Sequence, residues 1–173
     1  TVHQGLKSAT KLFQSTKCEA IKLEGAFPYQ LKLIERLTQT GIPVMGHVGL
    51  TPQSLRTLGG YRVKGRGEAG AQLIESALAV EAAGAFALVL ELIPAELATE
   101  ITSTLTIPTI GIGAGNQCDA QVLVWSDLMG LTEKPPKLAK AYRNLRAEIT
   151  AGVQEWARDV ASGAFPSEAE SFH

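Results

Sequence analysis

Cysteine is scarce in this sequence. Its 173 residues include only Cys18 and Cys118, and neither belongs to a Cys-x-x-Cys or Cys/His pattern. One such pair in a chain of this size does not suggest a disulfide framework, and no zinc-ligand spacing is present. We therefore expect both thiols to be reduced packing groups and the protein to be cytoplasmic.

An excess of one charge and a long apolar run are also lacking. Sixteen lysines and arginines balance 17 aspartates and glutamates, which argues against a nucleic-acid or membrane-surface partner. The longest apolar run, residues 82–90, ends at Glu91 and is far shorter than the roughly 20 residues of a membrane span. The 45% of hydrophobic residues and 19% of charged residues fit a globular core.

The N-terminus has neither an initiator methionine nor an apolar segment flanked by positive charge, because the chain begins Thr1-Val2-His3-Gln4. A secretory signal is therefore not predicted. We expect a fragment of a longer chain or a processed one.

The sequence repeatedly alternates an amphipathic helix, a glycine-containing turn and a short apolar strand. Strands are predicted at residues 20–24, 43–47, 86–91, 107–111 and 121–125. Helices are predicted at residues 29–38, 69–83 and 94–105. Gly41 and Gly84 stand where a left-handed helix end is expected. Because parallel strands need helical crossovers, the pattern predicts a parallel α/β fold.

The alternation of predicted helices and strands ends after Asp127. Pro135-Pro136 interrupts it, and apolar residues then recur at three- and four-residue spacing from Leu138 to Val160. This spacing predicts one long terminal helix that covers the rest of the fold or contacts a partner subunit.

Polar or glycine-rich elements end the predicted strands one after another. In chain order they are Lys22 and Glu24, His47, Glu91, Gly111–Gly115 and Asp127. Active sites of parallel α/β proteins lie at the carboxyl ends of the strands. A single charged strand end is usually a solvated rim residue, but several in a row predict a functional site.

Each candidate residue has a chemical role and a structural alternative. Glu24 offers the hard oxygen that Mg²⁺ prefers, and Lys22, on the same strand face, either pairs with it or anchors a substrate carboxylate. His47 is either a hydrogen-bonded structural group or a neutral donor to a keto or carboxylate oxygen. Glu91 emerges from apolar surroundings, which favours a general base over a structural carboxylate.

Two loops each allow more than one interpretation. The glycines of residues 111–115 either present backbone N–H groups to an anion or form a tight turn, and the third glycine comes too early for a dinucleotide fingerprint. The basic loop at residues 59–67 is a solvated connection, a lid or a contact to an acidic substrate tail.

Taken together, these segments resemble the ketopantoate hydroxymethyltransferase (3-methyl-2-oxobutanoate hydroxymethyltransferase) family. The resemblance covers nearly the whole chain in order, and residues 46–54 (Gly-His-Val-Gly-Leu-Thr-Pro-Gln-Ser) are its most specific part. The other matching segments are residues 21–25, 43–45, 59–63, 90–94, 111–115, 118–119, 121–124, 127–128 and 162–166.

The resemblance implies a (β/α)₈ TIM barrel, of which this chain supplies roughly strands 4 to 8 plus a C-terminal helix, all within one domain. It implies transfer of a hydroxymethyl group from 5,10-methylenetetrahydrofolate to 3-methyl-2-oxobutanoate through a Mg²⁺-stabilised enolate, giving ketopantoate for pantothenate and coenzyme A synthesis. By the resemblance, Glu24 matches a metal ligand, Lys22 and His47 match substrate contacts, and Glu91 matches the catalytic base. Family members form homo-oligomers, with a decamer expected.

The resemblance also implies that the first three barrel strands are missing, and with them a substrate-binding serine and two aspartates that hold the metal. The alternative is therefore a catalytically incomplete fragment or a structural subunit of the same fold. A related Mg²⁺-dependent barrel of the phosphoenolpyruvate mutase and isocitrate lyase group is disfavoured, because residues 46–54 and 111–115 match the first family together.

Overall fold

The computed structural model describes residues 1–54 and 63–173. Its contacts divide the chain into two compact units, residues 1–122 and 123–173. Residues 59–62 of the basic loop predicted at residues 59–67 lie outside the described residues. In the described part of the chain, no helix combines the length and the apolar character that crossing a membrane requires.

The first unit is a parallel sheet of five strands in the order β1-β2-β3-β4-β5. The strands are β1 (Ile21–Glu24), β2 (Val44–Gly49), β3 (Ala87–Glu91), β4 (Thr109–Ile112) and β5 (Ala120–Gln121). The helices are α1 (Val2–Thr16), α2 (Pro28–Gln39), α3 (Ala69–Ala82) and α4 (Ala95–Thr104), with a short 3₁₀ turn η1 (Pro52–Ser54). The predicted α/β fold with a parallel sheet is confirmed.

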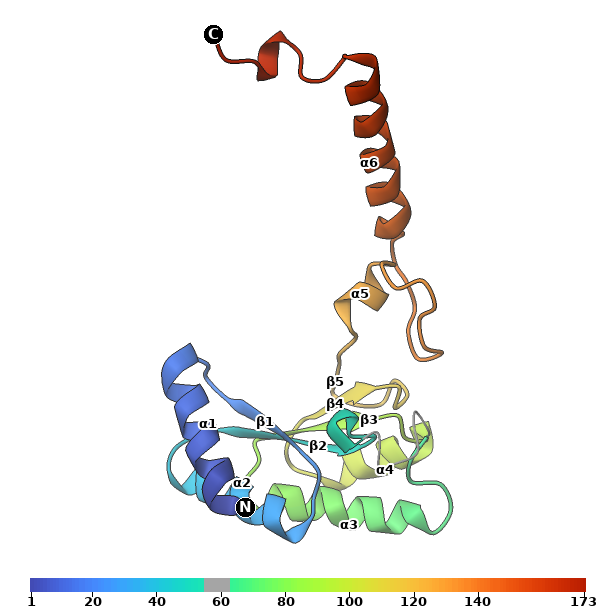
Figure 1. Ribbon diagram of the computed structural model, residues 1–173. Helices are drawn as coiled ribbons and strands as arrows, with labels where there is room; N and C mark the ends of the chain where they lie inside the picture. Colours follow the sequence, from blue (N-terminus) through green and yellow to red (C-terminus); the bar gives the residue numbers. More distant parts are fainter. Residues whose placement is uncertain (55–62) are drawn as a thin grey trace. The chain divides into compact units, whose positions relative to one another are not determined.

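The winding of this sheet distinguishes between two kinds of α/β protein. Each strand pairs with the next one in sequence, and Figure 1 shows α2, α3 and α4 on the same side of the sheet. A doubly wound fold would reverse its strand order and place helices on both faces. A sequential order with helices on one face is the pattern of a (β/α) barrel wall.

The two faces of the sheet differ in composition. On the helix side, Val44, Leu88 and Leu90 are fully buried against α2, α3 and α4, in a core that includes Ile34 and Ile101. Because side chains alternate along a strand, the opposite face carries the other set of residues, including Glu24, His47 and Glu91. The apolar core thus fixes which way these polar side chains point.

The glycines that were predicted to end two of the helices do so. Gly41 has φ 82° and Gly84 has φ 98°, so both adopt the left-handed conformation that ends a helix before the next strand. The predicted helices at residues 29–38, 69–83 and 94–105 agree with α2, α3 and α4 to within one residue at each end.

The last predicted strand, residues 121–125, is present but is shorter and begins one residue earlier. The strand β5 contains only Ala120 and Gln121, and the last sheet hydrogen bond joins Val122 N–H to the Gly111 carbonyl. Val122, Val124 and Trp125 are about half exposed or more, so this apolar run lacks the packing partners that would extend the strand.

The second unit contains α5 (Trp125–Leu128), α6 (Leu145–Ser162) and a 3₁₀ turn η2 (Glu168–Glu170). The long helix starts later than the predicted Leu138, because the Asn144 side chain caps it by accepting a hydrogen bond from Ala147 N–H. Gly163, with φ 77°, ends it. No residue of α6 is buried, and its apolar stripe is exposed by 46 to 57% at Ile149, Val153, Trp156 and Val160.

The turn between α4 and β4 gives a first testable prediction. Glu81 on α3 accepts hydrogen bonds from Thr106 O–H, Thr106 N–H and Ile107 N–H, and these bonds, that of the Thr106 hydroxyl foremost, lower the pKa of Glu81. A lowered folded-state pKa stabilises the fold above the pKa of a free glutamate and is lost as the pH falls through the folded-state pKa.

We therefore expect the wild type to lose more stability than Glu81→Gln as the pH falls from 7 to about 3, through and below the range in which a free glutamate titrates. Urea unfolding at a series of pH values measures this difference. The control is Glu75→Gln, an exposed change on the same helix, which should leave the wild-type pH dependence intact. Parallel pH profiles for Glu81→Gln and the wild type would contradict the assignment.

Candidate active site

The strand register brings three of the predicted site residues to one face at the carboxyl ends of adjacent strands. Glu24 on β1 lies opposite His47 on β2, and His47 lies opposite Val89 on β3. Glu91 follows Val89 by two residues and so projects from the same face. These three side chains form the candidate active site.

His47 lies between the two carboxylates. Its Nε2 atom is 3.1 Å from Glu91 Oε2, and its Nδ1 atom is 3.9 Å from Glu24 Oε1. The side chains are 1% exposed for His47, 10% for Glu24 and 12% for Glu91. Although Nε2 is close to Glu91, the pair is not aligned as a hydrogen bond, and within the described residues neither ring nitrogen makes one. Buried polar atoms without partners are uncommon in folded proteins and call for an explanation, such as a ligand.

Backbone groups and a glutamine hold Glu24 in place. Its Oε2 atom accepts a hydrogen bond from Gln53 N–H of η1 at 3.0 Å, and the Gln30 side chain donates to the Glu24 carbonyl. Gln30 also accepts from Phe27 N–H at 2.9 Å, which caps the start of α2. Oε1 of Glu24 is thereby left facing His47.

The sequence analysis missed Gln30 and Gln53 as supports of Glu24. For Gln30 a signal existed, because a glutamine at the third position of a helix is part of a capping box. For Gln53 the contact is made by the backbone, which no side-chain pattern reveals.

The backbone around Glu91 is held on both sides. Its carbonyl accepts from Leu50 N–H at 2.8 Å, and the next carbonyl, of Leu92, accepts from Lys64 N–H at 2.9 Å. Leu92 has φ 51°, a left-handed conformation that is unfavourable for a side-chain-bearing residue and that clusters at functional sites. The chain therefore turns sharply directly after Glu91.

The other predicted site residues are not brought into this cluster. Lys22 shares the face of Glu24 but is exposed, and in residues 1–54 and 63–173 it forms no ion pair with Glu24. Asp127 was expected at a strand end, which is wrong. It lies in α5 of the second unit, is buried, and accepts a hydrogen bond from the Thr132 hydroxyl.

The glycine loop after β4 packs as a turn. A Cβ atom at Gly115, whose φ is 79°, would lie 2.5 Å from Ala95 Cβ on α4. The Gln121 side chain donates to the Gly115 carbonyl at 2.9 Å. These contacts favour the tight turn over the anion-binding alternative.

The donor set fits a divalent cation only in part. Glu24 Oε1 provides one carboxylate oxygen of the type that Mg²⁺ prefers. However, the described residues include no group of three histidine, cysteine, aspartate or glutamate side chains that could hold a metal ion. The described part of this chain thus provides one carboxylate ligand rather than a complete metal site.

Comparison with known proteins identifies the family of this chain. The model of the ketopantoate hydroxymethyltransferase family matches residues 1–168. The chain belongs to this family. It is 54% identical over 164 residues to 3-methyl-2-oxobutanoate hydroxymethyltransferase of Acaryochloris marina, which covers 94% of this chain and 63% of that protein.

A second member of the family is similarly close. The chain is 50% identical over 170 residues to 3-methyl-2-oxobutanoate hydroxymethyltransferase of Mycolicibacterium vanbaalenii, covering 98% of this chain and 60% of that protein. The chain therefore spans about three-fifths of the length of the curated relatives that it matches. The resemblance derived from the sequence is confirmed, and the relatives are transferases by name.

Proposed function

We propose that this chain contributes the catalytic carboxylate to a hydroxymethyltransferase that converts 3-methyl-2-oxobutanoate into ketopantoate (2-dehydropantoate), in pantothenate and coenzyme A synthesis. The observation that carries the proposal is the position of His47 between Glu24 and Glu91, with both ring nitrogens buried. Family membership supports this choice of reaction.

The overall reaction balances as follows. C3 of the oxo acid loses its hydrogen as a proton and forms a bond to the one-carbon unit of 5,10-methylenetetrahydrofolate. The bonds from that carbon to the folate nitrogens break, and water supplies the hydroxyl oxygen of the product. The two folate nitrogens take up the C3 proton and one proton of that water, so tetrahydrofolate leaves and no oxidant or reductant is needed.

Each residue of the cluster has a role in this reaction. Glu91 removes the C3 proton as general base. His47 donates a hydrogen bond to the keto or carboxylate oxygen of the substrate, which gives its unpaired ring a partner. Lys22, exposed on the same face, anchors the substrate carboxylate.

Glu24 is proposed as one ligand of Mg²⁺. When bound, Mg²⁺ polarises the 2-oxo acid and makes C3 more acidic. We propose that this chain forms the C-terminal part of a single (β/α)₈ barrel domain, with β1 to β5 as strands 4 to 8, in a cytoplasmic homo-oligomer. The remaining barrel wall would then supply the further metal ligands.

Exchange of the C3 hydrogen of 3-methyl-2-oxobutanoate in D₂O tests the proposal without needing the folate. Mass spectrometry or proton NMR should show exchange that depends on both the assembled barrel and Mg²⁺. Assembled protein that binds the oxo acid but leaves its C3 hydrogen in place would overturn the proposal.

A catalytically incomplete fragment or structural subunit is the second candidate. It is favoured by the single carboxylate ligand in the described residues. The assembled barrel distinguishes the two, because a structural subunit should give no Mg²⁺-dependent exchange even when the remaining barrel wall is present.

The metal role of Glu24 is tested by Glu24→Gln. Loss of the carboxylate charge should raise the Mn²⁺ dissociation constant of the assembled barrel, measured by electron paramagnetic resonance, by about tenfold or more. It should also raise the Mg²⁺ concentration needed for half-maximal exchange. Glu19→Gln, an exposed change just before β1, is the control. Unchanged Mn²⁺ binding in Glu24→Gln would exclude Glu24 as a ligand.

A further inference from the structure

We propose that Gln30 is a positioning residue, which fixes the direction of the Glu24 carboxylate and thereby sets the affinity of the candidate active site for a divalent cation. The inference rests on the proposed function, which makes Glu24 a metal ligand. Gln30 stands at the third position of α2, six residues after Glu24. It is half-buried, and the family resemblance assigns it no role.

The peptide group between Glu24 and Gly25 is held at both of its polar atoms. The Glu24 carbonyl accepts a hydrogen bond from the Gln30 side-chain amide, and the Gly25 N–H donates to the His47 carbonyl at 2.8 Å. Fixing this peptide plane fixes ψ of Glu24, and the backbone angles of a residue determine which side-chain rotamers it can adopt. The two hydrogen bonds therefore hold Glu24 in the orientation that places its Oε1 atom 3.9 Å from His47 Nδ1.

Gly25 allows the amide of Gln30 to lie directly against the backbone. A Cβ atom at Gly25, whose φ is 95°, would lie 2.5 Å from Nε2 and 2.6 Å from Oε1 of Gln30. Any side chain at residue 25 would therefore displace the amide from the Glu24 carbonyl. The contact depends on a residue without a side chain as well as on the glutamine.

The hydrogen bonds of this contact require glutamine rather than glutamate at residue 30. Phe27 N–H can only donate and the Glu24 carbonyl can only accept. The amide of Gln30 must therefore present its oxygen to Phe27 N–H, at 2.9 Å, and its NH₂ group to Glu24. A glutamate would serve the capping box equally well and would interact better with the helix dipole, but it has no hydrogen to donate. The NH₂ group thus serves the site and not the helix.

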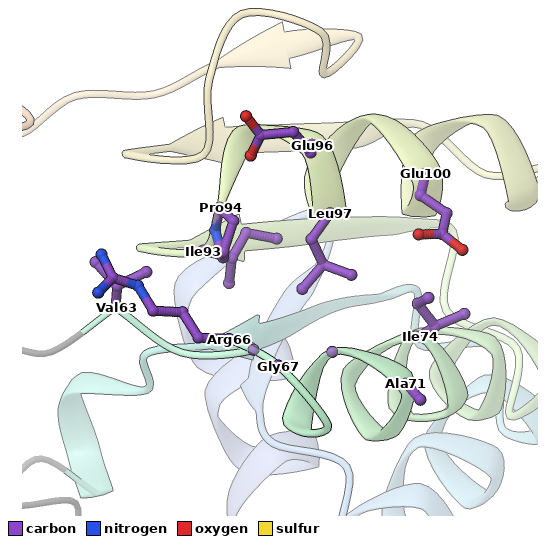
Figure 2. A pocket seen from close by; sticks show the side chains of 12 residues that line it. Val63, Arg66, Gly67, Ala71, Ile74, Ile93, Pro94, Glu96, Leu97 and Glu100 are labelled. Atoms are coloured by element: carbon purple, nitrogen blue, oxygen red, sulfur yellow. The ribbon is translucent and has the colours of Figure 1, made fainter.

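A second pair of carboxylates would also attract a cation and must be removed before the test. Glu96 and Glu100 lie one helical turn apart on α4 and, with Arg66, line a pocket of about 840 Å³. Figure 2 shows both carboxylates on this helix. The parent protein for the test is therefore the assembled barrel carrying Glu96→Gln and Glu100→Gln, two exposed changes that should leave the fold intact.

Two variants separate the two contacts of the amide. Gln30→Glu keeps the acceptor for Phe27 N–H and loses the donor to Glu24, whereas Gln30→Met keeps the length of the side chain and loses both. We expect Gln30→Met to raise the Mn²⁺ dissociation constant, measured by electron paramagnetic resonance, by about tenfold, as is typical when a group that orients a metal ligand is lost. Gln30→Glu should also weaken Mn²⁺ binding, although its added charge attracts the cation. A residue that served only as a helix cap would tolerate Gln30→Glu.

Mg²⁺-dependent C3 exchange provides a readout that a purely structural role would not move. Loss of folded protein would lower the exchange rate at every Mg²⁺ concentration. Misplacement of Glu24 should instead raise the Mg²⁺ concentration needed for half-maximal exchange and leave the rate at saturating Mg²⁺ near that of the parent protein. The control is Gln39→Glu, the same chemical change at the exposed last residue of α2, which should leave Mn²⁺ binding unchanged.

Mn²⁺ binding as tight as in the parent protein in either Gln30 variant, or an equal loss in Gln39→Glu, would overturn the positioning role. Glu24→Gln in the same parent protein distinguishes this failure from that of the proposed function. If Glu24→Gln weakened Mn²⁺ binding and the Gln30 variants did not, only the inference about Gln30 would fail. Absence of Mg²⁺-dependent exchange in the assembled wild type would instead overturn the proposed function.

Discussion

Glu91→Gln is expected to abolish nearly all C3 exchange while leaving binding of the 2-oxo acid and of the metal ion largely intact. Glutamine keeps the shape of the side chain and its contact distance to His47, but it cannot accept a proton at neutral pH. Loss of a positioned general base typically lowers a rate by about 10²–10⁴-fold. Exchange in D₂O measures the rate, and calorimetric titration with 3-methyl-2-oxobutanoate measures binding.

The control for this variant is Glu96→Gln, the same chemical change at an exposed position of α4 five residues later. It should exchange C3 hydrogen at the wild-type rate. If Glu91→Gln lost substrate binding but turned over normally whatever substrate it bound, Glu91 would be a binding residue and another group would be the base.

The sheet and its crossover helices could be predicted because local and long-range preferences agree there. The strand at residues 87–91 is uniformly apolar up to Glu91, and its residues 87–90 are all buried, as is typical of a parallel strand. Gly84 marks the preceding helix end through its positive φ. Where packing partners were lacking, as at Val122 and Val124, apolar β-branched residues alone did not produce a strand.

The candidate active site was predictable to a similar degree. Glu24, His47 and Glu91 were identified because they stand at the ends of predicted strands. The strand register in the structure then places their side chains on one face of the sheet. The near contact between His47 and Glu91 could not be predicted, because it depends on side-chain positions across two strands. The prediction that Asp127 ends a strand was wrong. Asp127 follows an apolar run that resembles a strand, but the chain forms α5 at that point.

The close approach of β2 and β3 beside Glu91 depends on Gly49. Its φ is 96°, and a Cβ atom at this position would lie 2.2 Å from the Glu91 carbonyl oxygen and 2.8 Å from Ile93 Cγ2. That carbonyl accepts a hydrogen bond from Leu50 N–H. A side chain at Gly49 would therefore push apart the two strand ends that place the base.

Gly49→Ala should be both less stable and less active than a matched change at Gly41. Gly41 also has a positive φ, 82°, but no atom lies within 4 Å of a Cβ atom built there, so Gly41→Ala should cost only the roughly 1–2 kcal/mol of left-handed strain. Gly49→Ala adds a clash with backbone, which should cost about 1–3 kcal/mol more. Because a displacement of about 1 Å can lower a rate by about 100-fold, C3 exchange should fall by that order in Gly49→Ala and stay near wild type in Gly41→Ala. Urea unfolding and the exchange assay measure the two effects, and equal behaviour of the two variants would show that the glycine at the end of β2 does not position Glu91.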